Sequence, residues 1–276
     1  MGENGLIIKT EQSLIQTEKA GIFEAIKTEC IALDSDIDLK EKTDKERLEI
    51  LVANLKTQSG LEVENTNYLV SSKFITITTK HGFIYTVLYD NTIIEGKFAY
   101  LDISDGSIKL KETGYIQGDN PFVEYEGKYI ITGSTTENTV SIIEKGNYDI
   151  TIKDLDIDVS TKGNVNAFLA GNKSTGLHVI LRLEGTNRLL SGSVTSLNWS
   201  GVTNADGGST LEFCGDGKLD VSCGNSHSAM CIGGNNAKNI TITSGEINAV
   251  KRGEKYGTPI GGTGACITIN RRNYSS

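Results

Sequence analysis

The chain has 276 residues, 37% of them hydrophobic, and a formal net charge of -8. This acidic balance excludes a nucleic-acid partner, whose phosphates require a basic stripe that the sequence lacks. No stretch approaches 18 apolar residues, so no membrane-spanning helix is expected.

Residues 1–60 are predicted to be helical and to attach to a neighbour or mediate a homo-oligomer. Thr43 and Asp44 are suited to cap a second helix at its N-terminus. Both apolar stripes are shorter than the roughly three heptads that a coiled coil requires. Their apolar residues recur at helical spacing, as Leu14, Ile15, Ile22, Phe23, Ile26 and Ile31, then Leu48, Leu51, Val52 and Leu55.

The segment between these helices, D-S-D-I-D from Asp34 to Asp38, has aspartates at the spacing found at the start of a calcium-binding loop. Leu39 stands where such a loop requires glycine, and Lys45 stands where it requires a bidentate glutamate. The sequence therefore disfavours a metal site in this segment.

Residues 61–99 are predicted to form a small β region. The runs F-I-T-I-T from Phe74 and F-I-Y-T-V-L-Y to Tyr89 flank a turn at residues 80–82, which is a hairpin signal. We expect a connector or a cap over the open end of the repeats that follow, with a separate β domain as the alternative.

Residues 100–276 are predicted to form a parallel β-helix, a solenoid. One unit recurs: an alternating run, a glycine corner, a second alternating run, a loop, and a short apolar segment closed by glycines. A single unit cannot bury its own apolar face, so successive units are expected to stack on one another in register. The first-run positions, spaced by roughly 27 to 32 residues, are Ile150, Val179, Leu211, Ile240 and Ile267. Gly215, Gly217 and Gly245 are expected to turn the corners with positive φ.

A resemblance accompanies this pattern. L-D-I-S-D-G-S-I-K-L from Leu101, Y-D-I-T-I-K-D-L-D-I-D-V from Tyr148, L-R-L-E-G-T-N-R-L-L-S-G from Leu181 and the I-G-G closures resemble Gly-rich right-handed parallel β-helix domains of Firmicutes surface and secreted proteins. These domains are often labelled carbohydrate-binding or adhesin-like, and similar coils occur in phage tail proteins. The resemblance covers about residues 100–270. It implies an all-β, right-handed β-helix, preceded here by a short α-helical segment and the small β region.

The chain departs from this family in two ways. It lacks an ordinary signal peptide, and its last coil begins at Ile267 but stops at Ser276. The resemblance implies an extracellular, cell-surface or virion location, and the last coil is expected to be truncated or completed by oligomerisation.

The outward positions of the coils are acidic and amide-rich and are expected to form ladders at a spacing of about 4.8 Å. Such acids either solvate the sheet or bind Ca²⁺, which would let them bridge to an acidic polysaccharide. Calcium is the one cofactor under consideration. The ladder residues are Asp154, Asp156, Asp158, Asp216, Asp220, Glu246 and Asn248.

Two aromatic residues in loops are candidates for stacking on a sugar ring, Trp199 and Tyr256. The alternative for each is packing under its own loop. With Asp156, Asp158, Asp220 and Asn248, they make up the candidate ligand-binding set.

An enzyme is an alternative, because polysaccharide lyases and pectin hydrolases share the coil architecture. Asp156 and Asp158 could supply paired carboxylates, and a lyase base could come from Lys153, Arg182 or Arg188. No catalytic signature is visible, and fold alone does not define an activity. The serines around His227 lack serine-hydrolase spacing, and His178 is expected to face solvent.

The five cysteines make an odd count without a C-x-x-C pair, which disfavours a disulfide framework and a zinc site. Buried thiols are expected at Cys30, Cys214, Cys223, Cys231 and Cys266.

The leading interpretation is a non-enzymatic surface-recognition or adhesion module that binds a polysaccharide or cell-surface glycan. The second is a structural component of a phage tail fibre or baseplate, and the third is a polysaccharide lyase or glycoside hydrolase.

Overall fold

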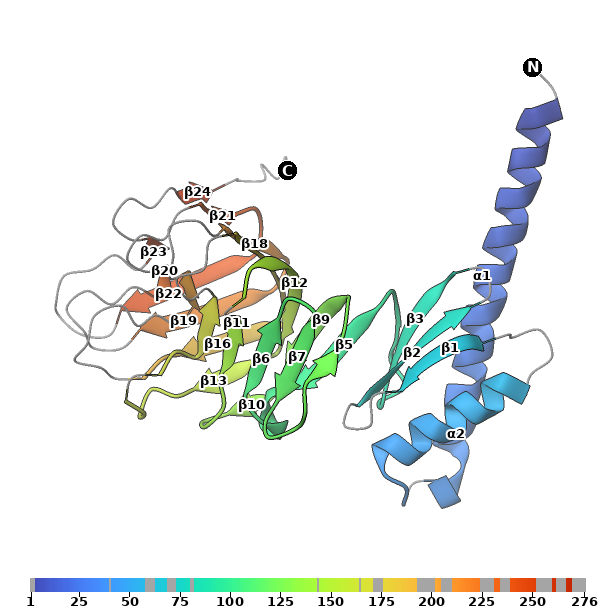
Figure 1. The fold of residues 1–276 in the computed structure, drawn as a ribbon, viewed down its shortest axis with the longest axis horizontal. Coiled ribbons are helices and arrows are strands. Elements are labelled where there is room, and N and C mark those ends of the chain that lie inside the picture. Colours follow the sequence, from blue (N-terminus) through green and yellow to red (C-terminus); the bar gives the residue numbers. More distant parts are fainter. Residues whose placement is uncertain are drawn as a thin grey trace, which may run out of the picture. The chain divides into compact units, whose positions relative to one another are not determined.

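The computed structural model describes residues 3–39, 41–57, 63–68, 73–79, 82–142, 144–163, 165–170, 176–192, 202–204, 210–223, 231–233, 239–251, 260–261 and 267–269. The chain divides into two compact units, Met1–Phe98 and Ala99–Ser276. The first unit contains two helices and an antiparallel sheet, and the second is a β-solenoid (Figure 1).

The first unit begins with α1 (Glu3–Ser35), a short 3-10 turn η1 (Ile37–Leu39) and α2 (Asp44–Thr57). Thr43 caps α2, because its Oγ1 accepts the N–H of Glu46 at 3.3 Å. The Glu46 carboxylate in turn accepts the N–H of Thr43 at 2.8 Å, which completes a capping box. The predicted N-cap is confirmed.

Four antiparallel strands follow, each paired with the next along the chain: β1 (Val63–Tyr68), β2 (Phe74–Thr79), β3 (Ile84–Leu88) and β4 (Ile93–Glu95). The predicted hairpin is the pair β2 and β3, in which Thr76 lies opposite Thr86.

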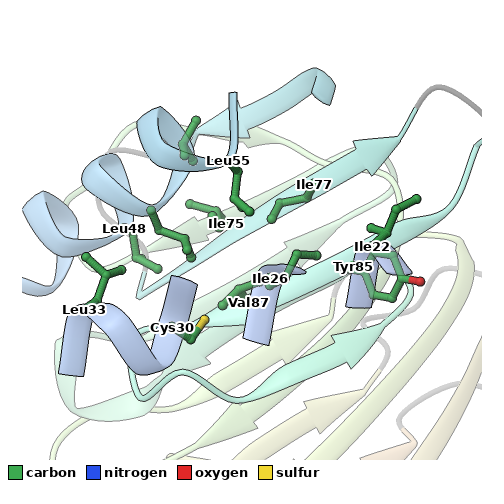
Figure 2. Packing of buried hydrophobic residues seen from close by; sticks show 12 residues of the cluster. Ile22, Ile26, Cys30, Leu33, Leu48, Leu55, Ile75, Ile77, Tyr85 and Val87 are labelled. Atoms are coloured by element: carbon green, nitrogen blue, oxygen red, sulfur yellow. The ribbon is translucent and has the colours of Figure 1, made fainter. Parts of the chain in front are cut away.

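Both helices and the sheet share one core, in which apolar side chains of α1 and α2 face those of β2 and β3 (Figure 2). The predicted stripe of α2 is confirmed, since all four of its residues are buried. The stripe predicted for α1 is wrong in part, because it combined residues from two faces of the helix. Ile15, Phe23 and Ile31 are exposed. The buried residues of α1 recur every three or four positions, as Ile22, Ile26, Cys30 and Leu33.

In the second unit the chain visits three sheets in turn, and each repeated coil adds one strand to each sheet. Sheet I contains β5 (Phe98–Asp102), β9 (Lys128–Thr132), β12 (Gly146–Lys153), β15 (Leu177–Glu184), β18 (Thr210–Gly215), β21 (Ile240–Ile242) and β24 (Ile267–Ile269). Sheet II contains β10 (Ser134–Thr135), β13 (Asp156–Asp158), β16 (Thr186–Leu190), β19 (Lys218–Cys223) and β22 (Glu246–Lys251). The parallel stacking confirms the predicted β-solenoid (Figure 1).

Sheet III contains β6 (Ile108–Lys111), β7 (Gly114–Gln117), β8 (Val123–Glu124), β11 (Val140–Ile142), β14 (Phe168–Ala170), β17 (Val202–Asn204), β20 (Ile232–Gly233) and β23 (Ile260–Gly261). The strand pairs from β6 to β23 are parallel, whereas β7 pairs antiparallel with both β6 and β8. The turn η2 (Ile103–Asp105) links β5 to β6. At this end of the solenoid, the rings of Tyr115, Tyr125 and Tyr129 pack together, with centroids 5.5 to 6.2 Å apart.

The predicted register of sheet I holds for four of five coils: Val179 pairs with Leu211, and Ile240 pairs with both Leu211 and Ile267. The prediction is wrong for the first coil, in which Ile150 was expected to pair with Val179. Val179 pairs with Tyr148 instead, and Ile150 pairs with Leu181. Side chains alternate with a period of two, so Ile150 faces the core in either register.

Two of the three predicted corner glycines have positive φ, 103° at Gly215 and 93° at Gly245. Gly217 is not among the positive-φ residues, and the expectation for it is wrong. A Cβ at Gly217 would lie 2.8 Å from backbone atoms of Glu184. Glycine is therefore required there by the close approach of the neighbouring coil.

Candidate functional site

The outer face of sheet II carries a column of polar side chains from four successive strands. Asp156 pairs in register with Arg188, Arg188 with Asp220, and Asp220 with Asn248. On the first three strands, the residue that follows each of them is apolar and buried. Because strand side chains alternate between faces, the column points away from the core. We call these four residues the polar column.

Arg188 joins two strands within this column. Its Nε and Nη2 donate to the two carboxylate oxygens of Asp156 at 2.9 and 3.1 Å, and its Nη1 donates to Asp158 at 3.1 Å. A bidentate guanidinium–carboxylate pair fixes both side chains in direction. The sequence predicted ladders of acidic and amide residues, and the structure adds a cation, because Arg188 stands between Asp156 and Asp220 in the column.

The Asp158 carboxylate is held from two sides. It accepts the N–H of Ser160 at 3.1 Å in addition to the bond from Arg188. Burial raises the pKa of this carboxyl, but the Ser160 hydrogen bonds and the charge of Arg188 outweigh burial and hold the pKa below its usual value. Asp158 is therefore ionised at neutral pH.

In the C-terminal half of the column the carboxylate of Asp220 is also paired, but by an amide and a more distant ammonium group and not by a guanidinium. Asn248 donates its Nδ2 to Asp220 at 3.0 Å. Lys218 lies between two carboxylates, with its Nζ 3.7 Å from Asp220 and 3.4 Å from Glu246. Positive and negative groups therefore alternate over sheet II.

A second polar group lies on sheet I. Arg182 donates to both oxygens of Asp149 at 2.8 and 3.2 Å, and Lys128 Nζ lies 3.2 Å from the same carboxylate. Burial raises the Asp149 pKa, but these two cations outweigh burial and lower the pKa below its usual value. Arg182, a candidate lyase base, is thus engaged in an ion pair.

No group of three or more His, Cys, Asp or Glu side chains that could hold a metal ion occurs within the described residues. The segment 34–38 lies at the end of α1 and in η1, where Asp34 pairs with Arg47 at 2.6 Å and Asp36 accepts the N–H of Asp38 at 3.0 Å. These contacts belong to a helix end and not to a cation-binding loop.

The two aromatic candidates, Trp199 and Tyr256, lie outside the described residues, as do His227 and Cys266. His178 is exposed on β15, as predicted, and its Nδ1 lies 2.7 Å from Thr210 Oγ1 on the next strand. Sheet II thus brings together four of the six candidate ligand-binding residues.

Sequence reasoning missed a buried asparagine behind the polar column. Asn187 is fully buried, and its Oδ1 accepts the N–H of Leu155 from the preceding coil at 3.0 Å. Its Nδ2 donates to the carbonyl of Glu184 at 3.0 Å and to that of Lys218 in the next coil at 3.1 Å. The signal available in the sequence was an amide at an inward position, two residues before the buried Leu189.

Comparisons of the chain with protein-family models, with curated proteins and with solved structures found no match. Within the described part of the chain, no helix has the length and apolar character needed to cross a membrane.

Proposed function

We propose that the outer face of sheet II binds a neutral polysaccharide or cell-surface glycan, and that the solenoid is a non-enzymatic surface-recognition module. The polar column carries this proposal. It presents carboxylate, guanidinium and amide groups on successive strands, which repeat about every 4.8 Å. Sugar hydroxyls donate and accept hydrogen bonds, and the column offers partners of both kinds.

The column is also preorganised for binding. Arg188 and Asp156 are fixed by two hydrogen bonds, and Asn248 and Asp220 by one. Fewer side chains must therefore be ordered when a ligand binds, which reduces the entropic cost of binding. A guanidinium has five N–H donors, and Arg188 uses three of them on the two aspartates.

The charges on this face favour a neutral ligand over an acidic one. Arg188 and Lys218 already pair with carboxylates of sheet II. An acidic polysaccharide would have to compete with these carboxylates for the two cations. A neutral glycan needs no such exchange and no bridging Ca²⁺.

The same geometry disfavours acid–base catalysis by Asp156 and Asp158. A glycosidase general acid needs a raised pKa to hold its proton at neutral pH. Arg188 bonds to both carboxylates, and the pKa of Asp158 is lowered. The arrangement supports recognition better than hydrolysis or elimination.

A second candidate function is structural assembly, as in a fibre or baseplate. Exposed apolar side chains on α1 favour it, since Ile15 and Ile31 are 45% and 57% exposed. This candidate concerns the first unit and is compatible with glycan binding by the second.

A polysaccharide panel tests the proposal. The purified protein is run through gels that contain neutral or acidic polysaccharides, with calcium or with a chelator, and the polysaccharides are assayed for new reducing and unsaturated ends. We expect retardation by a neutral polysaccharide, unchanged by the chelator and without new ends. New chain ends would establish an enzyme instead, and the absence of retardation by every polysaccharide would refute binding.

A further inference from the structure

Two buried cysteines meet at the corner between sheets II and III. The Sγ atoms of Cys223 and Cys231 lie 3.1 Å apart, and neither residue has any exposed surface. Their separation of eight residues in the sequence gave no reason to pair them. The fold brings them into contact.

Strand pairing holds both residues in place. Cys223 is the last residue of β19 and pairs with Lys251 of β22. Cys231 directly precedes β20, whose Ile232 pairs with both Val202 and Ile260. The two sulfurs are therefore presented by two different sheets, on either side of residues 224–230.

We propose that Cys223 and Cys231 form a disulfide when the chain folds under oxidising conditions. The S–S bond length is about 2.05 Å, so the two sulfurs need to approach by about 1 Å. The bond would link sheet II to sheet III within one coil and close a ring across residues 224–230.

Oxidised glutathione, a small disulfide, supplies the oxidising equivalents. One cysteine thiolate attacks a glutathione sulfur, forms a mixed disulfide and releases one glutathione thiolate. The second cysteine thiolate attacks the cysteine sulfur of that mixed disulfide and releases the second glutathione thiolate. The two cysteines lose two protons and two electrons, and one oxidised glutathione becomes two reduced molecules. Because both thiols are fully buried in the folded chain, this exchange takes place before folding is complete.

The remaining described cysteines provide controls. Cys30 is buried in the first unit, and Cys214 is partly exposed, with its Sγ 3.6 Å from Arg182 Nη1. Both are free thiols. The proposal therefore predicts one specific link.

The full-length chain is unfolded, reduced and refolded in a buffer of reduced and oxidised glutathione, and its circular dichroism is compared with that of the untreated protein. Thiols are then titrated under denaturing conditions. We expect three thiols where the reduced chain has five, and an intact mass lower by two hydrogen atoms. Five thiols, or a glutathione adduct on either cysteine, would overturn the proposal.

The position of the link can be read from one peptide. Trypsin releases residues 219–238 as a single peptide that contains both cysteines, and cyanogen bromide cleaves it after Met230. The two fragments stay joined until a reductant is added if Cys223 and Cys231 are linked. Fragments that separate without reductant, or a link to another cysteine, would refute the pairing.

Variants and melting provide an independent readout. Cys214→Ser should keep the link, and Cys223→Ser should abolish it. A reductant should lower the melting temperature of the oxidised wild type by about 5 °C, because the ring restricts the unfolded chain, and should leave Cys223→Ser unchanged. If Cys223→Ser does not fold, the wild-type peptide map still decides the question.

Discussion

Arg188 donates two hydrogen bonds to Asp156 of the preceding coil, 2.9 Å from Nε to Oδ1 and 3.1 Å from Nη2 to Oδ2. Arg188 and Asp156 are directly opposed in the parallel register of β13 and β16. The pair is thus a link between coils as well as the first half of the polar column.

A double-mutant cycle should measure this link. Arg188→Ala and Asp156→Asn are expected to show a coupling of about 1 kcal/mol in the free energy of unfolding, because the pair is bidentate but partly exposed. Arg188→Lys should recover only part of the loss, since an ammonium cannot form the fork. Urea denaturation provides the measurement, with exposed Lys109→Ala as a control. Strictly additive effects of the two substitutions would contradict the link.

Asn187→Ala should destabilise the solenoid far more than the exposed Asn147→Ala. The first substitution leaves the buried N–H of Leu155 without its acceptor and removes two further hydrogen bonds. We expect a loss of about 3 kcal/mol in the free energy of unfolding, against less than about 0.5 kcal/mol for the control. A loss at Asn187 no larger than that of the control would show that it does not join the coils.

The sequence predicted the solenoid because its apolar runs alternate and recur, and stacking is the only way to bury them. It placed Val179 and Leu211 correctly in one column. It misplaced Ile150, because alternation is unchanged by a displacement of two residues. The partners of Asp156 could not be predicted, since they depend on which residues of two coils lie opposite each other.

Two further features were outside the reach of pattern reasoning. In α1, both the buried Ile22 and the exposed Ile15 belong to plausible helical stripes, and only the position of the sheet selects one face. The contact between Cys223 and Cys231 depends on where sheets II and III place the end of β19 and the start of β20, which the spacing of the two cysteines does not encode.

The ion pair on sheet I should make stability depend on pH in acid. The pKa of Asp149 is lower in the folded chain than in the unfolded chain, where it is about 3.9. Its contribution to stability is therefore complete above that value and is lost as the pH falls through the folded-state pKa. Asp149→Asn should be less stable than wild type above about pH 4, and the difference should shrink at lower pH.

Urea denaturation across a pH series measures this difference. Glu126→Gln, at an exposed site, is the control for the removal of one carboxylate. A difference between Asp149→Asn and wild type that stays constant down to pH 2 would contradict a lowered pKa.

The exposed apolar residues of α1 should mediate self-association. We expect wild-type protein to be oligomeric, and Ile15→Ser with Ile31→Ser to shift it to a monomer, because apolar surface leaves water on assembly. These residues lie outside the buried stripe of α1, so the fold of the first unit should be kept. Light scattering gives the mass, with exposed Gln16→Ser as a control. A wild-type monomer, or an unchanged mass in the variant, would rule out this role.

The most direct test of glycan recognition is the affinity of the polar column for the neutral polysaccharide that most retards the wild type. Asp220→Ala combined with Asn248→Ala removes half of the column without touching its buried neighbours, and Lys109→Ala changes the outer face of sheet III instead. The account predicts at least about tenfold weaker binding for the double variant, equivalent to about 1.4 kcal/mol, and unchanged binding for Lys109→Ala. Equal affinity of the double variant and the wild type would contradict it.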